Sequence, residues 1–353
     1  MGPWRDTPGA SRSRANCWPW RRSIARARSR RWYEWPVTQP SATSRWLPSY
    51  ILLALIWGGS FAFMKIGLES LTPVGVSLGR IVLGAVTLLV ISAITRTRLP
   101  PRRAWKSLFI YAALVSSIPW TMFAFSETHI SSALAGIING ATPLMTLIAI
   151  LLVFPEERPN RQRIIGLSIG FVGVLVVVGV WQGLGGGTMI GIGACIIAIT
   201  CYGISYPYGR RHLTGGPLAS DLTPLALATG VLLMGTIQTA PIALITGVVV
   251  APIQVSTVIA MLGLGCLGSG IAYILNFRVL GRADATTAST VTYIPPLIAV
   301  IIGAIFLDEH ITWNQPLGGV LVVVGAATAQ GILHLPNRSR MRRERASGTI
   351  SEP

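Results

Sequence analysis

The chain carries its apolar residues in blocks of roughly twenty, separated by short polar segments. A helix needs about 20 consecutive apolar residues to cross a hydrocarbon core of about 30 Å. Only 12% of the residues are charged, whereas an average soluble domain carries about 25%. That little charge cannot cover a water-exposed surface of this size. The blocks therefore predict an all-α polytopic membrane protein.

The apolar blocks number ten, and the short connections between them are those expected of antiparallel neighbours in a helical bundle. We therefore predict ten transmembrane helices. They span residues 50–68, 74–94, 107–126, 131–153, 164–181, 189–207, 222–246, 256–276, 286–306 and 316–334.

Basic residues are unevenly distributed over the loops between these spans. When the N-terminus is placed inside, every inside loop and both tails carry arginine or lysine, whereas the five outside loops carry none. Cytoplasmic loops are the ones that hold an excess of Lys and Arg. We therefore expect a multi-pass protein of the cell membrane (plasma or inner) with both termini cytoplasmic. The outside loops lie near Glu69, Glu127, Gly185, Val250 and Glu309.

A net charge of +17 raises the question of a nucleic-acid partner. The basic residues concentrate in the tails and the inside loops, where they suit anionic lipid headgroups, and no nucleic-acid-binding motif surrounds them. We expect membrane lipids and a small-molecule substrate as partners, and no nucleic acid. Only Lys65 and Arg80 are basic residues within the predicted spans.

The two tails differ in composition from the spans. Residues 1–49 are rich in Arg, Trp and Pro without helical or strand periodicity, and they contain no apolar segment typical of a secretory signal. We predict a basic disordered N-terminal tail. One hypothesis is that translation starts at Val37 and that residues 1–36 are not part of the protein. Residues 335–353 are predicted to form a basic, disordered cytoplasmic tail.

The sequence repeats itself at a constant offset of 152 residues, which predicts a first five-helix repeat over 50–181 and a second over 189–334. Five is an odd number, so the second copy must enter the membrane upside down. Inverted repeats give one fold two nearly equivalent conformations, each open to one side, with the substrate site near the midplane. This arrangement favours transport by alternating access. The matched pairs are Pro143 with Pro295, Glu157 with Glu309, Gly166 with Gly318, and Gly173 with Gly325.

The two repeats also resemble the EamA-type branch of the drug/metabolite transporter superfamily over about residues 50–334. The resemblance rests on the segment 57–61 (Trp-Gly-Gly-Ser-Phe), on Arg80, and on the duplicated order of a small-residue run, Pro, an apolar run, Glu and a Gly-rich span. It implies ten helices and the movement of amino acids, related metabolites or drugs, usually outward, through a central cavity. In span six, Tyr202-Gly203 replaces the expected Trp-Gly pair, a departure that bears on the cavity lining.

Aromatic residues, and residues with a polar group in apolar surroundings, are the candidates for substrate contact. Ionisable and amide groups are expensive in a bilayer and face the bundle interior, and Trp and Tyr offer an apolar face with one polar group. Packing or an interfacial position remains the alternative for each aromatic residue, and structural pairing with Glu69 or a helix C-terminus for Arg80. The candidates are Trp57, Ser60, Arg80, Trp120, Phe123, Asn139, Tyr202, Tyr206, Tyr273, Asn276 and Tyr293.

Proton coupling has few candidates in this chain. No Asp or Glu lies near the middle of a predicted span, and Glu127 with neighbouring His129, at the outer end of span three, is the remaining pair. A plain loop pair, with facilitated export down a gradient, is the open alternative. Pro143 and Pro295 interrupt matched spans, and we predict that they serve as hinges.

Enzymatic activity is not expected. The four cysteines show no spacing typical of a metal site, and no nucleophile–base set is visible, so we predict no metal and no cofactor. The sequence favours an integral membrane transporter that exports a small metabolite by alternating access. The alternatives are a flippase for a lipid carrier and a membrane scaffold that transports nothing.

Overall fold

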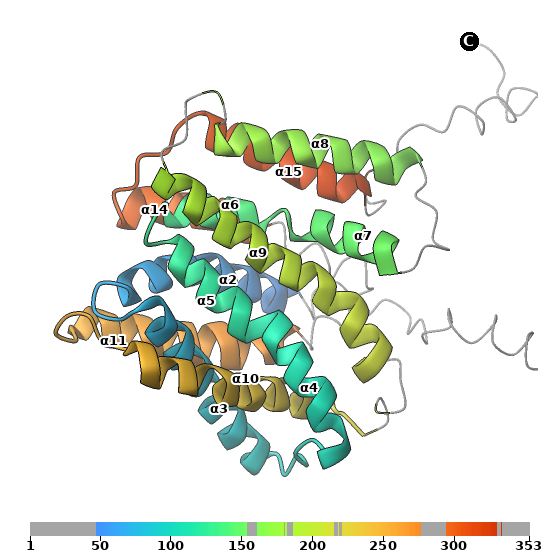
Figure 1. The fold of residues 1–353 in the computed structure, drawn as a ribbon, viewed down its shortest axis with the longest axis vertical. Coiled ribbons are helices and arrows are strands. Elements are labelled where there is room, and N and C mark those ends of the chain that lie inside the picture. The colour runs from blue at the N-terminus through green and yellow to red at the C-terminus, as the bar shows by residue number, and fades with distance from the viewer. Residues whose placement is uncertain are drawn as a thin grey trace, which may run out of the picture. The chain divides into compact units, whose positions relative to one another are not determined.

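The computed structural model describes residues 47–153, 161–179, 181, 186–214, 218, 221–276, 294–329 and 333. Within these residues the regular secondary structure is helical, apart from one isolated antiparallel bridge between Leu71 and Val249. Figure 1 shows the arrangement of the helices, with colours that run from blue near the N-terminus to red near the C-terminus. The helical segments are α2 (Leu47–Gly67), α3 (Pro73–Ile94), the 3-10 turn η2 (Arg102–Ala104), α4 (Trp105–Ala112), the π-helix η3 (Ala113–Ser117), α5 (Ile118–Ser126), α6 (Ser132–Asn139), α7 (Thr142–Val153), α8 (Arg161–Val178), α9 (Gly186–Gly209), the π-helix η5 (Arg210–Thr214), α10 (Pro224–Thr246), α11 (Val255–Leu262), the π-helix η6 (Gly263–Ile271), α14 (Pro295–Phe306) and α15 (Asn314–Ala329).

Seven helices of the described chain are long and apolar enough to cross a membrane. They confirm a multi-pass, all-helical protein. Three shorter apolar helices, Ile164–Val178, Pro295–Phe306 and Asn314–Ala329, coincide with the remaining predicted spans. The count of ten spans therefore stays a prediction, and the start of the predicted span 286–306 lies outside the described residues. The predicted tails 1–49 and 335–353 lie outside them too, apart from residues 47–49.

Three helices begin at a hydroxyl residue that caps the first free backbone amides. Thr72 Oγ1 accepts from Gly75 N at 3.0 Å, and Thr223 Oγ1 accepts from Ala226 N at 3.1 Å. In both cases a proline follows at the first helical position, where its missing N–H costs nothing. Ser131 caps α6 in the same way, through Leu134 N at 3.2 Å.

The two prolines predicted as hinges both lie where a helix begins. The helix breaks between Asn139 and Thr142, and Pro143 is the second residue of α7. Pro295 is the first residue of α14. Each proline thus stands in the first turn, where it breaks no internal hydrogen bond. Their role as hinges stays a prediction.

Helices α8 and α15, which belong to different predicted repeats, lie side by side (Figure 1). Glycines allow the contact: a Cβ on Gly166 would lie 2.7 Å from the carbonyl oxygen of Gly325, and a Cβ on Gly318 would lie 2.7 Å from that of Gly173. Because Gly318 and Gly325 are the offset partners of Gly166 and Gly173, the second contact is the first one with the two halves exchanged.

Hydrogen bonds across this pair of helices show the same exchange. Gln162 Nε2 donates to the carbonyl oxygen of Thr328 at 3.2 Å, and Asn314 Nδ2 donates to that of Val176 at 3.2 Å. Residues 314 and 328 are the offset partners of residues 162 and 176. A contact that recurs when two units are exchanged is the mark of two-fold symmetry.

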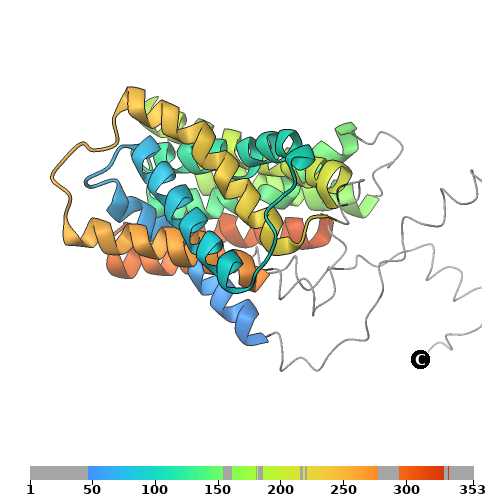
Figure 2. The ribbon, with the colours of Figure 1, turned by 90° about the horizontal axis from the view of Figure 1, so that it is seen from below.

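The largest apolar core cluster includes side chains from α2, α5, α6, α9 and α14. Helix α6 is the most enclosed of these elements, because every residue from Ser132 to Ile138 is buried. Helices α3 and α10 pack together on another side, with η6 against α3. Figure 2 shows the connections α2–α3 and α10–α11 at the same end. There Thr72 N donates to Val248 O at 3.0 Å and Val250 N donates to Ser70 O at 2.9 Å.

Candidate functional site

Arg80 is a cation buried inside the helical assembly. Its side chain is only 8% exposed, although α3 is otherwise an apolar helix. Its Nε donates to Ser269 Oγ at 3.0 Å, and its guanidinium carbon lies 4.0 Å from the centroid of the Trp120 ring. A guanidinium over an indole face is held by the ring quadrupole, more strongly when water is excluded. Arg80, Ser269 and Trp120 are the centre of the candidate site.

The close approach of α3 and η6 brings Ser269 to Arg80. A Cβ on Gly84 would lie 2.8 Å from Ser269 Cβ, and one on Gly265 would lie 3.3 Å from the carbonyl oxygen of Arg80. Larger residues at either glycine would separate the two helices. Ser269 also lies in a π-helix of nine residues. Such helices are rare overall, but many of them occur at functional sites.

Aromatic side chains from three helices extend this centre. Trp120 Nε1 donates to the hydroxyl oxygen of Tyr202 at 2.8 Å, which joins α5 to α9. Phe123 lies next to Tyr202, with ring centroids 6.0 Å apart, and meets Phe61 of α2 edge to face at 5.6 Å. The substitution of Tyr202 for the tryptophan expected in span six therefore places a hydroxyl group where it accepts the indole N–H of Trp120.

The remaining predicted contact residues are more dispersed. Trp57 is half-buried and packs against a smaller cluster with Leu53 and Ala54, and Tyr273 packs with the cluster that contains Trp120. Ser60 is buried and donates to Ile56 O at 2.9 Å. The backbone carbonyl oxygen of Asn139 accepts a hydrogen bond from Thr142 Oγ1 at 2.7 Å. Three candidates do not join the Arg80 centre in the described chain: Tyr206 is 54% exposed, Asn276 is at the end of a described segment, and Tyr293 lies outside the described residues.

Glu127 is a fully buried carboxylic acid at the end of α5, with 0% exposure. Neither of its carboxyl oxygens has a hydrogen-bond partner in the described chain. Lys65 of α2 donates instead to the backbone carbonyl oxygen of Glu127, at 2.6 Å. A buried charge without a partner is unfavourable, so a carboxyl group in this position favours its protonated form.

The same surroundings control the acidity of Glu127, which lies just beyond the span Arg102–Ser126. Burial raises the pKa of its carboxyl well above the usual range, the nearby Lys65 lowers it, Glu309 raises it, and Arg80 lowers it. Cys195 of α9 donates to Ser126 Oγ at 3.2 Å beside this carboxyl. Burial is the dominant effect, because the charged form loses its hydration there.

His129 does not pair with Glu127. Its Nδ1 lies 2.8 Å from Thr128 Oγ1 and 3.2 Å from Phe125 O, and its ring lies 4.8 Å from that of Phe125. The two residues of the predicted pair therefore have different surroundings: Glu127 is a buried acid, and His129 forms its hydrogen bonds within the turn that contains it.

Glu309 binds the start of α6. Its Oε1 accepts from Ser132 N at 2.7 Å and its Oε2 accepts from Ala133 N at 3.0 Å. A carboxylate at a helix N-terminus satisfies two free amides and complements the helix dipole. Glu309 follows α14, so it ties two helices of different predicted repeats. The sequence pairs Glu309 with Glu157 but does not reveal this partner.

Two residues of the site were not among the predicted contacts. Ser269 had only the Gly-Ser-Gly run around it as a signal, since a serine in a small-residue span is usually read as packing. Lys65, one of the two basic residues within the predicted spans, donates to a backbone carbonyl oxygen of the protein. Glu69 is exposed and makes no ion pair with Arg80 in the described chain. Nor does any described group of three His, Cys, Asp or Glu residues have the arrangement of a metal site.

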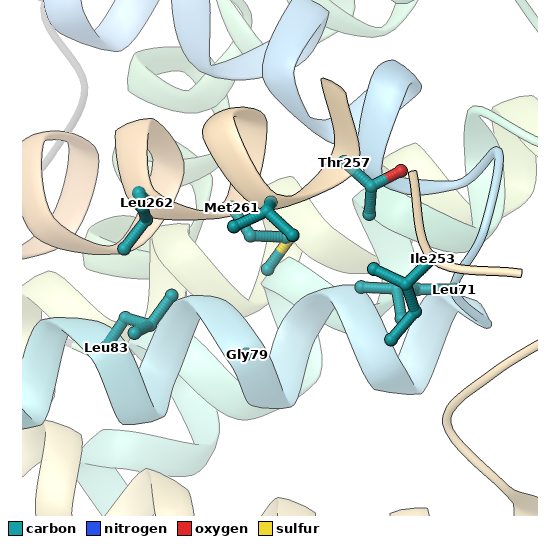
Figure 3. A pocket seen from close by; sticks show the side chains of 8 residues that line it. Leu71, Gly79, Leu83, Ile253, Thr257, Met261 and Leu262 are labelled. Atoms are coloured by element: carbon teal, nitrogen blue, oxygen red, sulfur yellow. The ribbon is translucent and has the colours of Figure 1, made fainter. Parts of the chain in front are cut away.

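An apolar recess of about 290 Å³ lies between α3 and α11, next to this centre along α3 (Figure 3). Its lining includes Leu71, Leu83 and Met261, and its polar side chain, Thr257, shares a hydrogen bond with Ser70 Oγ at 3.0 Å. A recess of this kind suits an acyl chain or another apolar group. The polar chemistry of the protein lies instead around Arg80 and Glu127.

These features define a multi-pass helical membrane protein with a charged and aromatic centre enclosed between its helices. Sequence comparison gives the family. The profile of the EamA-like transporter family matches residues 44–179 and again residues 189–329. The chain belongs to the EamA-like transporter family, a family of membrane transporters that move small molecules.

Individual relatives are similar at low identity but over nearly their whole length. "Protein PagO" of Salmonella typhimurium is 26% identical over 83% of this chain and 95% of its own. A "Probable terminal-alkyne amino-acid exporter" of Streptantibioticus cattleyicolor is 23% identical over 84% and 95%. An "Uncharacterized transporter YdfC" of Bacillus subtilis is 24% identical over 78% and 88%. One protein of known crystal structure shares the fold, with a TM-score of 0.59 at 17% identity over 83% of this chain and all of its own.

Proposed function

We propose that this protein exports a small metabolite (an amino acid, a related compound or a drug) across the cytoplasmic membrane by alternating access. In this proposal ten spans form two inverted repeats over residues 50–181 and 189–334, and both termini are cytoplasmic. The exchange-related contacts of α8 and α15 carry the proposal. Gln162 bonds to Thr328 as Asn314 bonds to Val176, with equal distances of 3.2 Å. Two halves related in this way can exchange their conformations, which opens the site to each side in turn.

The direction and the orientation rest on separate observations. One relative is named as an exporter of an amino acid, which supports outward movement. The basic loops support cytoplasmic termini. Single cysteines in a cysteine-free background test the orientation: a membrane-impermeant thiol reagent applied outside should label Val249→Cys and spare Arg103→Cys. The reverse labelling would invert the topology.

The predicted contact residues serve as the substrate site in this proposal, with Arg80, Trp120, Phe123 and Tyr202 at its centre. Trp57, Ser60, Asn139 and Tyr273 are placed toward its margins. The aromatic faces would hold the apolar part of a substrate, and the buried polar groups would orient it.

Glu127 serves as the proton site in this proposal. Its carboxyl is fully buried and has no hydrogen-bond partner among the described residues, which favours the protonated form. Opening of the outer end would hydrate the carboxyl and bring Lys65 within reach of its charged form, which favours release of that proton. The groups that face it are Lys65 of α2, Arg80 of α3, Cys195 of α9 and Glu309 after α14. His129 is not needed.

A counterflow assay in proteoliposomes tests transport. Proteoliposomes that contain the purified full-length protein are loaded with an unlabelled metabolite pool. Entry of labelled amino acids, organic acids and nucleobases is then measured. We expect exchange of one chemical class, reduced by Trp120→Phe and unchanged by Trp105→Phe, a surface tryptophan that is 48% exposed. Folded protein that exchanges none of these solutes would contradict the proposal.

A further inference from the structure

Arg80 carries a buried positive charge that no acid in the described chain neutralises. The ion pair found among the described residues joins Arg103 to Asp221 at the surface. Glu127 is a buried acid near enough to interact electrostatically with Arg80, yet it forms no ion pair with Arg80, and its carboxyl oxygens have no hydrogen-bond partner in this part of the chain. Burial of a guanidinium away from water is strongly unfavourable unless an anion accompanies it. Among the described residues, the charge of Arg80 is thus without a directly paired counterion.

The protein uses only part of the guanidinium. Of its five N–H groups, the described structure engages the one on Nε, through Ser269, while Trp120 covers one face of the plane. The two terminal nitrogens have no protein partner among the described residues. They form the edge that binds a carboxylate through two parallel hydrogen bonds. Ser269 and Trp120 fix the plane of the group and so fix the direction of that edge.

A second donor, the hydroxyl of Tyr202, lies near enough to the guanidinium to interact with it electrostatically. The hydroxyl oxygen of Tyr202 accepts from Trp120 Nε1 at 2.8 Å. Its single proton therefore remains available to another acceptor. Trp120 and Phe123, which is buried at 2% exposure, supply apolar faces next to these donors. A ligand that fits this set has an anionic oxygen pair and an apolar or planar portion.

We infer that the transported substrate carries a carboxylate and that this carboxylate is the missing counterion of Arg80, bound through the two terminal nitrogens. This inference rests on the proposed transport function and names its substrate class. One fixed positive charge matches one carboxylate, whereas a doubly charged phosphate would leave excess negative charge in the site. Neutral and purely cationic compounds leave the guanidinium unpaired and are excluded on the same ground.

Matched ligand pairs test this inference by binding, which needs no transport. The probes are the standard L-amino acids and benzoate, each compared with the corresponding carboxamide, and inorganic phosphate. The readout is the thermal unfolding midpoint of purified full-length protein, since a ligand that binds only the native state stabilises it. We expect at least one carboxylate to raise the midpoint, with at least tenfold weaker binding of its carboxamide and no effect of phosphate.

Four variants assign the effect to the guanidinium edge. Arg80→Gln should weaken carboxylate binding at least tenfold and remove the preference for carboxylate over carboxamide. Arg80→Lys keeps the charge but not the paired donors, so an intermediate loss is expected. Ser269→Ala releases the guanidinium plane and should lower affinity while keeping the preference for carboxylates. Arg102→Gln is the matched control, because Arg102 also lies over a tryptophan, 6.0 Å from the Trp105 centroid, but is exposed.

The outcomes separate this inference from the transport function. Carboxylate binding that depends on Arg80, without counterflow of the bound compound, would overturn transport and leave the anion site standing. Counterflow that treats carboxylates and carboxamides alike, and that survives Arg80→Gln, would overturn the anion site and leave transport standing. Stabilisation by phosphate in place of carboxylates, or by none of the probes, would also overturn it.

Discussion

Gly166 of α8 and Gly325 of α15 approach so closely that a Cβ on either residue would lie 2.7 Å from the carbonyl oxygen of the other. Small residues allow helices to pack backbone to backbone, and in a membrane this packing replaces the hydrophobic force that holds helices together in water. The contact joins the two predicted repeats. It should therefore tolerate no added methyl group.

Gly166→Ala tests this packing. Because the new Cβ would collide with backbone atoms, which cannot move away as a side chain would, we expect a loss of about 1–3 kcal/mol. A lower unfolding midpoint in detergent measures it. Gly193→Ala in α9 is the control, since a Cβ there would have no neighbour within 4 Å, and alanine favours a helix over glycine. An equal loss in both variants would show that the close contact does not determine the effect.

The carboxylate of Glu309 should hold α6 and α14 together at the side that is predicted to face outward. Glu309→Ala removes two hydrogen bonds that Ser132 N and Ala133 N donate to the charged carboxylate oxygens. Such bonds each contribute about 1.5–3 kcal/mol. We expect a cysteine placed at Ser131 to react faster with an impermeant thiol reagent added outside, because α6 and α14 separate more often.

Two further variants sharpen this experiment. A Cβ on Gly303 would lie 2.5 Å from Glu309 Oε2, so Gly303→Ala should displace the carboxylate and increase labelling in the same direction. Glu69→Gln changes another acid of the predicted outer loops, an exposed one, and should leave labelling unchanged. Unchanged labelling in both Glu309→Ala and Gly303→Ala would show that the carboxylate does not hold these helices.

The buried acid Glu127 predicts a pH dependence of stability. Its pKa is raised in the folded protein, chiefly by burial, so the folded state binds its proton more tightly than the unfolded state. Stability is then fully present below the ordinary pKa of 4.5 and declines as pH rises through the raised value. Unfolding midpoints measured from pH 5 upward should fall for the wild type.

Glu127→Gln isolates the contribution of this carboxyl. Glutamine has nearly the shape of the protonated acid but no proton to lose, so its midpoint should vary less with pH than that of the wild type. In proteoliposomes the same variant should exchange substrate with little response to an imposed pH gradient. A pH profile identical in variant and wild type would exclude Glu127 as the titrating group.

The sequence predicts the spans well because a bilayer demands long apolar helices, and the blocks around α2, α3 and α10 meet that demand without ambiguity. The offset of 152 residues likewise pairs Gly166 with Gly318, and these two glycines make corresponding contacts across α8 and α15. Local sequence does not reveal where a helix changes its winding. The π-helix η6 continues an apolar span whose residues would also suit an α-helix.

Contacts between distant segments account for what the sequence could not predict in the site. Arg80 and Trp120 were candidates because a charge and an indole are conspicuous in apolar spans. Ser269 is 189 residues from Arg80 along the chain, and its role depends on glycines that bring α3 and η6 together. The partner of Lys65 is a backbone carbonyl, which no residue type can signal.

The hydrogen bond between Trp120 Nε1 and the Tyr202 hydroxyl, 2.8 Å long, should fix the orientation of the Trp120 indole beside Arg80. Trp120→Phe leaves Tyr202 without its donor, and Tyr202→Phe leaves the buried indole N–H without its acceptor. Each change should lower stability by about 0.5–1.5 kcal/mol, the usual net value of such a bond. Each should also weaken ligand binding, because Trp120→Phe removes the indole that contacts the guanidinium, and Tyr202→Phe releases that indole from its fixed orientation. The double variant should cost less than the sum of the two single changes, since the second substitution removes no further bond. Losses that add in full would mean that the two residues act independently, and Tyr202 would then not serve to position Trp120.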